Sequence, residues 1–315
     1  MNDSAAPNST GDGRRGPDIV VVGAAARDLA RDDARGWRLG GGVSYSALTT
    51  ARLGLTTAAL VGVDRLAAYA PELDLLREAG VDVQLVELDR GPVFENVDTP
   101  NGRIQLVFSR ADPIAVANIP PAWRAARGWI LAPIAGELGD EWATAMPDNA
   151  LVGLGWQGLL RDLESSERVQ RRPPGPSPLV ARADLIGVSQ DDVARDTDLA
   201  DLWRHVKPGS TLVLTKGDRG GLLIQPTPDG QPSFRRYPAI PPARTADPTG
   251  AGDVFLAALL AARVEPRLIR GRAAAGYDAL LAAAVASLVL EGHGLLGVPD
   301  RDAVRRRMAE ARQPA

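Results

Sequence analysis

The sequence contains no cysteine and few of the other residue types that enzymes use as nucleophiles or metal ligands. The absence of cysteine excludes thiolate nucleophiles, disulfides and thiolate metal sites, and it fits a cytoplasmic protein. The two histidines, His205 and His293, have no metal-ligand spacing and lie in no nucleophile motif. Lys207 and Lys216 are the only lysines among 36 basic residues. Neither lies in a P-loop, so a P-loop NTPase is excluded.

Long hydrophobic runs and a strong charge bias are also missing. The longest apolar run, residues 280–290, is about half of the roughly 20 residues that a membrane span needs, and it predicts a buried core helix. The net charge of −3 gives no support for partners such as nucleic acid or anionic membranes. Residues 1–17 are small and polar, without the features of a signal peptide, and predict a disordered tail. We therefore expect a soluble protein with one domain over 18–315.

Short apolar segments alternate with helical ones along most of the chain. Gly54 and Gly80 each follow a helical segment as a stop signal. This alternation predicts an α/β fold with a mostly parallel sheet. The predicted strands are 19–23, 57–63, 81–88, 129–132, 151–154, 184–188 and 211–215, and the predicted helices are 46–54, 71–79, 248–260 and 273–290.

Residues 92–110 break the alternation. Two segments of alternating apolar and polar residues flank Thr99-Pro100-Asn101-Gly102, and Asn-Gly in that setting is a strong hairpin signal. An antiparallel hairpin inside an α/β chain predicts an appendage to the main sheet. Appendages of this sort often act as lids.

Residues 247–253, Asp-Pro-Thr-Gly-Ala-Gly-Asp, precede an apolar helix and form the most informative motif. Two glycines around Ala251 let backbone N–H groups at the helix start approach an anion. Asp253 then lies in the first turn, where a carboxylate beside a phosphate site is suited to accept a proton from an alcohol. The alternative is a glycine turn followed by a helix whose first turn contains Asp for dipole reasons alone.

Three motifs, at 40–47, 215–221 and 247–253, together resemble the ribokinase-like, or PfkB-type, carbohydrate kinases. Their order and spacing are similar to the family's from about residue 18 to about residue 300. The resemblance implies a three-layer sandwich with a small β lid. It also implies ATP-dependent transfer of a phosphoryl group to a hydroxyl of a small sugar or polyol.

The resemblance also implies roles for individual residues. Asp253 would be the catalytic base, and Asp192 would organise Mg²⁺ through water. Asp247 and Thr249 match positions that hold a monovalent cation such as K⁺ in some relatives. The anion site for the transferred phosphoryl group would comprise Gly250, Ala251 and Gly252, the ATP site Thr215, Gly217, Gly220 and Thr249, and the acceptor site Asp28, Gly40, Gly41, Tyr45 and Arg110.

Two departures from the family pattern affect these roles. Tyr45 stands where many relatives have Asn, and Ser189-Gln190-Asp191-Asp192 replaces Asn-x-x-Glu, with Asp192 keeping the charge. Tyr45 and the polar residues of the hairpin, Arg110 included, are similar to those of relatives proposed to act on inositol-like polyols. Relatives often pair through the lid, so the resemblance also implies a homodimer.

Several alternatives stay open at this point. Asp28 could cap a helix, Tyr45 could be a core residue, and Arg110 could be a solvated surface charge. A nucleoside acceptor would require aromatic stacking surfaces, whereas aromatic residues make up only 4% of the chain. A sugar or nucleotide sensor without activity would have no use for the base Asp253.

Overall fold

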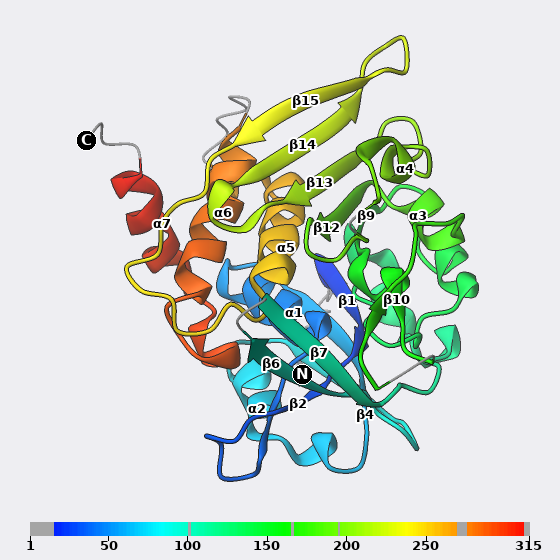
Figure 1. The fold of residues 1–315 in the computed structure, drawn as a ribbon, viewed down its shortest axis with the longest axis vertical. Helices are drawn as coiled ribbons and strands as arrows, with labels where there is room; N and C mark the ends of the chain where they lie inside the picture. The colour runs from blue at the N-terminus through cyan, green and yellow to red at the C-terminus, as the bar shows by residue number, and fades with distance from the viewer. Residues whose placement is uncertain (1–15, 100–101, 165–166, 195, 270–275, 312–315) are drawn as a thin grey trace, which may run out of the picture.

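A computed structural model describes residues 16–99, 102–164, 167–194, 196–269 and 276–311, and its centre is one nine-stranded sheet (Figure 1). The strands are β1 (Ile19–Ala24), β4 (Thr57–Val63), β5 (Asp82–Glu87), β8 (Gly128–Leu131), β9 (Leu151–Gly155), β12 (Leu185–Ser189), β13 (Thr211–Thr215), β14 (Gly221–Pro226) and β15 (Pro232–Tyr237). Their order is β15-β14-β13-β12-β9-β8-β1-β4-β5. Pairing is parallel from β13 to β5, and β14 and β15 are antiparallel at one edge.

Helices cover both faces of this sheet and give three layers (Figure 1). One face packs against α1 (Gly42–Arg52), α2 (Pro71–Glu78), α5 (Ala251–Val264), α6 (Tyr277–Val289) and α7 (Arg301–Glu310). The other face packs against α3 (Pro178–Arg182), α4 (Leu199–Trp203) and several 3₁₀ turns. Because both faces are covered, β1 and β4 are apolar and fully buried along their whole length. The predicted fold class is confirmed.

A separate four-stranded sheet forms the lid. Its order is β3-β2-β6-β7, with β2 (Arg27–Leu29), β3 (Trp37–Leu39), β6 (Val93–Thr99) and β7 (Gly102–Ser109). The hairpin predicted over 92–110 is therefore present as β6 and β7, although Pro100 and Asn101 of its turn lie outside the described residues. Strands β2 and β3 were not predicted, since three residues are too few to show a two-residue periodicity.

Some helix boundaries differ from the prediction. The helix expected over 46–54 begins earlier, at Gly42, because Gly41 with φ 91° serves as its N-cap. The helix expected over 248–260 begins at Ala251 and extends to Val264. The first residues of the helix predicted over 273–290 lie outside the described residues, as do residues 1–15 of the predicted tail. Over the parts of the chain with described structure, no helix has the length and apolarity to cross a bilayer.

A glycine in the turn after β13 tests how tightly this edge of the sheet is packed. Gly220 has φ +72°, and a Cβ there would lie 2.1 Å from the carbonyl oxygen of Tyr237. We expect Gly220→Ala to lower the free energy of unfolding by about 2–4 kcal/mol, measured by urea denaturation. Gly230→Ala is the matched control, since Gly230 has φ +80° with nothing within 4 Å. It should lose only about 1 kcal/mol, and equal losses would contradict the packing argument.

Candidate active site

The predicted site residues meet at the carboxyl ends of the parallel strands, where α/β proteins bind ligands. The acceptor-side carboxylate Asp28 interacts electrostatically with Asp247 and Asp253, and Asp253 interacts with Asp192. Around the donor turn, the Gln190 N–H donates to the carbonyl of Thr215 at 2.9 Å. These residues come from four separate segments of the sequence, around residues 28, 192, 215 and 250.

The first turn of α5 provides the anion site. Its N-cap, Gly250, is left-handed with φ 80°, and a Cβ there would lie 2.4 Å from the ring of Tyr45. Among the described residues, no main-chain carbonyl accepts the N–H of Gly252 or Asp253. Unpaired N–H groups at a helix N-terminus attract an anion.

Asp253 lies between the first turns of two helices. A Cβ on Gly42, the first residue of α1, would lie 2.6 Å from Oδ1 of Asp253, so only glycine leaves room for this carboxylate. Burial and the nearby Asp192 raise the pKa of Asp253 to about 6, against an opposing effect of Arg161. A carboxylate with this pKa is ionised at neutral pH and still a competent proton acceptor.

Asp28 is on lid strand β2, so it is not a helix cap. A Cβ on Gly40 would lie 2.0 Å from its Oδ2, which explains the first glycine of the Gly40-Gly41 pair. Burial raises the pKa of Asp28 to about 7, with Arg161 acting in the opposite direction and Asp247 and Asp253 adding to the rise. Asp28 and Asp253 are therefore two acids with raised pKa values in the same region of the fold.

Tyr45 is buried, and its ring packs against the Gly250 turn. Burial raises the pKa of the Tyr45 phenol, as do Asp247 and Asp28, so the hydroxyl stays protonated. The ring therefore supports the anion-binding turn from α1. A direct contact of Tyr45 with the acceptor stays a prediction.

The donor side is the turn that follows β13. Gly217 and Gly220 both have positive φ, and the Lys216 N–H donates to the carbonyl of Gly220 at 2.7 Å, which closes the turn. Arg219 donates to the side chain of Gln190 at 3.1 Å and links the turn to the loop after β12. Thr215, Gly217 and Gly220 thus belong to one closed turn after β13. Their role in binding ATP stays a prediction.

Asp192 is held in place by two hydrogen bonds, from Gln157 Nε2 at 2.6 Å and from the Ser189 N–H at 3.1 Å. Each carboxylate oxygen retains a further lone pair. Asp192 therefore fits a role in which it holds waters of a Mg²⁺ ion. Within the described ranges, no group of three acidic or histidine side chains is placed to ligate a metal directly.

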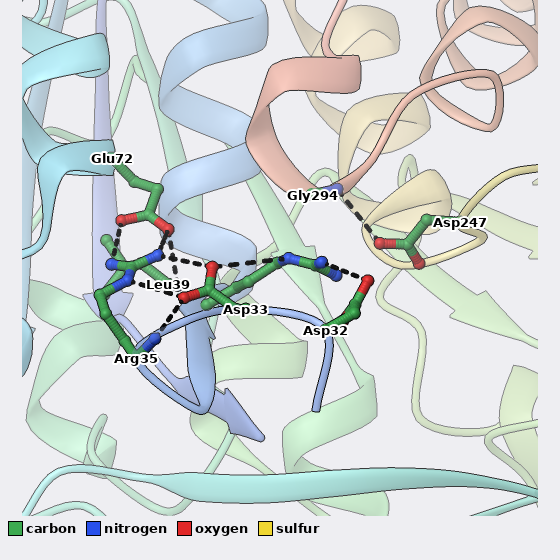
Figure 2. Close-up of polar contacts among 8 residues, drawn as sticks. Asp32, Asp33, Arg35, Leu39, Glu72, Asp247 and Gly294 are labelled. Atoms are coloured by element: carbon green, nitrogen blue, oxygen red, sulfur yellow. Dashed lines mark hydrogen bonds and ion pairs between the residues drawn. The ribbon is translucent and has the colours of Figure 1, made fainter. Parts of the chain in front are cut away.

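Asp247 fits a monovalent cation less well. Its two oxygens accept the N–H groups of Thr249 at 2.9 Å and Gly294 at 3.1 Å (Figure 2). Arg38, on β3, packs its Cδ 3.8 Å from where a Cβ on Gly294 would lie. Its guanidinium is within electrostatic range of Asp247, so a fixed positive charge already lies near this carboxylate.

The same region anchors the lid. Arg35, in the turn between β2 and β3, pairs with both oxygens of Glu72 at the start of α2, at 2.6 and 2.9 Å, and with Asp33 at 3.1 Å (Figure 2). Arg38 pairs with Asp32 of that turn at 2.6 Å. These bonds fix the β2–β3 turn to the body of the protein.

Two residues of the site were not predicted. Arg161 follows β9 and lies near Asp28, Asp192 and Asp253. Glu137 is fully buried and accepts the N–H groups of Ala24, Ile134 and Ala135, which ties the end of β1 to the loop after β8. The one signal in the sequence that could have indicated Glu137 is the presence of a single acidic residue within an apolar stretch.

Arg110 is a residue that was predicted. It lies at the end of the lid hairpin and pairs with Glu164.

The sequence and fold match known proteins in two ways. Residues 183–301 match the model of the pfkB family carbohydrate kinases, while no curated protein matches the chain. This match covers the C-terminal part of the chain, which is therefore similar to that family.

Solved structures of the same fold include kinases with different substrates. A pyrophosphate-dependent kinase in the ribokinase family, complexed with a pyrophosphate analogue and myo-inositol, has a TM-score of 0.70 and 20% identity, covering 91% of this chain and 99% of that one. A nucleoside kinase from Methanocaldococcus jannaschii has a TM-score of 0.66 and 18% identity, covering 94% and 99%. The Arabidopsis thaliana ribokinase, complexed with ribose and ATP, has a TM-score of 0.61 and 18% identity, covering 93% and 99%.

The raised pKa of Asp28 gives a stability prediction. Its folded-state pKa of about 7 lies above the unpaired value of 3.8, so the charged form is disfavoured in the fold and stability is lost as pH rises through 7. Asp28→Asn should therefore raise the free energy of unfolding at pH 8 by about 1–3 kcal/mol. The gain should shrink as pH falls toward 4, as followed by thermal melts. Asp148→Asn, at an exposed site, should show no such trend. A pH-independent gain would argue against a buried charge.

Proposed function

We propose that the protein transfers the γ-phosphoryl group of ATP to a hydroxyl of a small sugar or polyol of the inositol-like kind. The observation that supports this most is the position of Asp253 beside the unpaired N–H groups of α5, with Asp28 across the site. A base next to an anion site is what direct in-line transfer requires.

The proposed reaction is a single displacement. The acceptor oxygen forms a bond to the γ-phosphorus as the bond from that phosphorus to the β-γ bridging oxygen breaks, and ADP leaves. Asp253 takes the proton of the attacking hydroxyl. The N–H groups at the start of α5, with that of Gly252 unpaired, stabilise charge on the transferred group. Asp192 would hold Mg²⁺ through water, and that ion would neutralise the phosphate oxygens.

ATP as donor is supported by the pfkB family match, which includes the donor turn. Inorganic pyrophosphate is the alternative donor, because a similar structure is that of a pyrophosphate-dependent kinase. Wild-type enzyme assayed with each donor against a panel of polyols, pentoses, hexoses and nucleosides would distinguish these possibilities.

A nucleoside acceptor is less well supported. A base would stack on an aromatic face, but Phe94 and Tyr45 are both buried, and Phe94 is covered by Arg161. Phe108 on β7 is exposed and is not part of the buried cluster that contains its neighbour Val107. Within the described residues, the acceptor side therefore presents carboxylates and an arginine instead of a stacking surface.

Asp253→Asn tests the mechanism. The amide cannot accept the proton, so kcat should fall by roughly 10³-fold or more, while the KM for the donor changes little. Asp229→Asn, in the exposed β14–β15 turn, is the control and should keep full activity. Near-normal turnover by Asp253→Asn would overturn the assignment of the base.

Monovalent-cation dependence is a second test, because Arg38 already places positive charge near Asp247. We expect activity in potassium, sodium and tetramethylammonium chloride to agree within about 2-fold. Arg38→Gln should lower activity and make it respond to K⁺, and K⁺ should raise the melting temperature of this variant more than that of the wild type. Strong activation of the wild type by K⁺ would show instead that Asp247 shares its charge with a bound ion.

A further inference from the structure

Arg161 is the first residue of β10 (Arg161–Asp162), the strand that follows a 3₁₀ turn at the carboxyl end of β9. It lies at the catalytic edge of the main sheet, facing the lid. Its guanidinium lies over the ring of Phe94 on lid strand β6, 5.5 Å from the ring centre. The residue thus joins the main domain to the lid at the acceptor side.

The guanidinium lies among carboxylates from four other segments. These are Asp192 after β12, Asp253 on α5, Asp28 on β2 and Glu137 after β8. Yet none of these four carboxylates, all in the described part of the chain, forms an ion pair with Arg161 at 4.0 Å or less. None of them accepts a hydrogen bond from it either. Arg171, its partner across β10 and β11 (Gln170–Arg171), is exposed.

An arginine in electrostatic range of several carboxylates, with no hydrogen bond to any of them, keeps its donors for a ligand. A guanidinium can only donate hydrogen bonds, and a carboxylate can only accept them. A hydroxyl group does both, so it can accept from the arginine and donate to a carboxylate. Adjacent hydroxyls of a polyol would satisfy both kinds of group.

We propose that Arg161 binds the hydroxyl oxygens of the acceptor, between Asp28 and Asp253, and so selects an uncharged polyhydroxylated acceptor. The inference rests on the proposed function. With Asp28 and Asp253 ionised, these three residues carry a net charge of −1, which opposes sugar acids and sugar phosphates. The same guanidinium favours the ionised form of both carboxylates, because it opposes the effect of burial on both.

Arg161→Gln, Arg161→Lys and Arg171→Gln test this role, with kcat/KM for the acceptor measured from pH 5 to pH 9. Arg161→Gln should lower kcat/KM about 100-fold, with the donor KM within about 3-fold of wild type. In the pH profile of this variant, the fall of kcat/KM on the acid side should occur at a pH about one unit higher than in the wild type. The reason is that the pKa values of Asp28 and Asp253 rise when the positive charge is removed. Arg161→Lys should keep this fall, the acid limb, where it is in the wild type, and Arg171→Gln should change neither quantity.

The outcomes separate this inference from the proposed function. A wild-type protein that phosphorylates no acceptor with either donor would overturn the proposed function itself. An active wild type whose acid limb is unchanged by Arg161→Gln would overturn only the role of Arg161, as would efficient phosphorylation of sugar acids. If Arg161→Gln melts well below wild type, the kcat/KM of Arg161→Lys for the acceptor decides the question. Lysine keeps the charge but loses the planar set of donors, so a lowered kcat/KM would support the role of Arg161 and a wild-type value would overturn it.

Discussion

The site depends on the contact between the first turns of α1 and α5. Two helix N-termini meet there, each with unpaired N–H groups, and Asp253 lies between them. This approach is sterically possible only because Gly42 has no side chain to strike the carboxylate and Gly250 none to strike Tyr45. The positive ends of both helices favour anions, so the same contact that holds Asp253 also suits the proposed phosphate site.

Burial works against this arrangement. Burial raises the pKa values of both Asp28 and Asp253, and the negative charge of neighbouring carboxylates raises each of them further. Only Arg161 provides an opposing effect common to the two. The fold therefore tolerates an unfavourable charge distribution, which is typical of functional sites where local stability is reduced for the sake of chemistry. The charges of the β2–β3 turn are arranged favourably by comparison, since the guanidinium of Arg35 forms two hydrogen bonds with the carboxylate of Glu72.

Local sequence signals predicted the scaffold well. Strand β4 matches its prediction to the residue, because a buried parallel strand needs a continuous apolar run. The motif at 247–253 predicted a helix start with an anion site, since glycine spacing is itself the physical requirement. Arg161 could not be predicted in this way. Nothing in its neighbours along the chain distinguishes it from the other 33 arginines, and its surroundings come from segments brought together only by folding. Gly40 was predicted from its motif, but the reason for it was not, because the contact it relieves is with Asp28 on strand β2.

The region that matches the family model contains the residues proposed for the phosphate donor, and the residues proposed for the acceptor lie before it. Residues 183–301 contain Asp192, the proposed donor turn, the proposed anion site and the proposed base Asp253. Asp28, Tyr45, the lid and Arg161 all precede this region. Phosphoryl transfer imposes one geometry on every kinase of this fold, so the donor half is recognisable from sequence. The acceptor half only has to complement one small molecule, and different residues can do so on the same backbone. The chemistry can therefore be read from the C-terminal half, whereas the acceptor must be inferred from side chains that the N-terminal half and the lid place around Asp253.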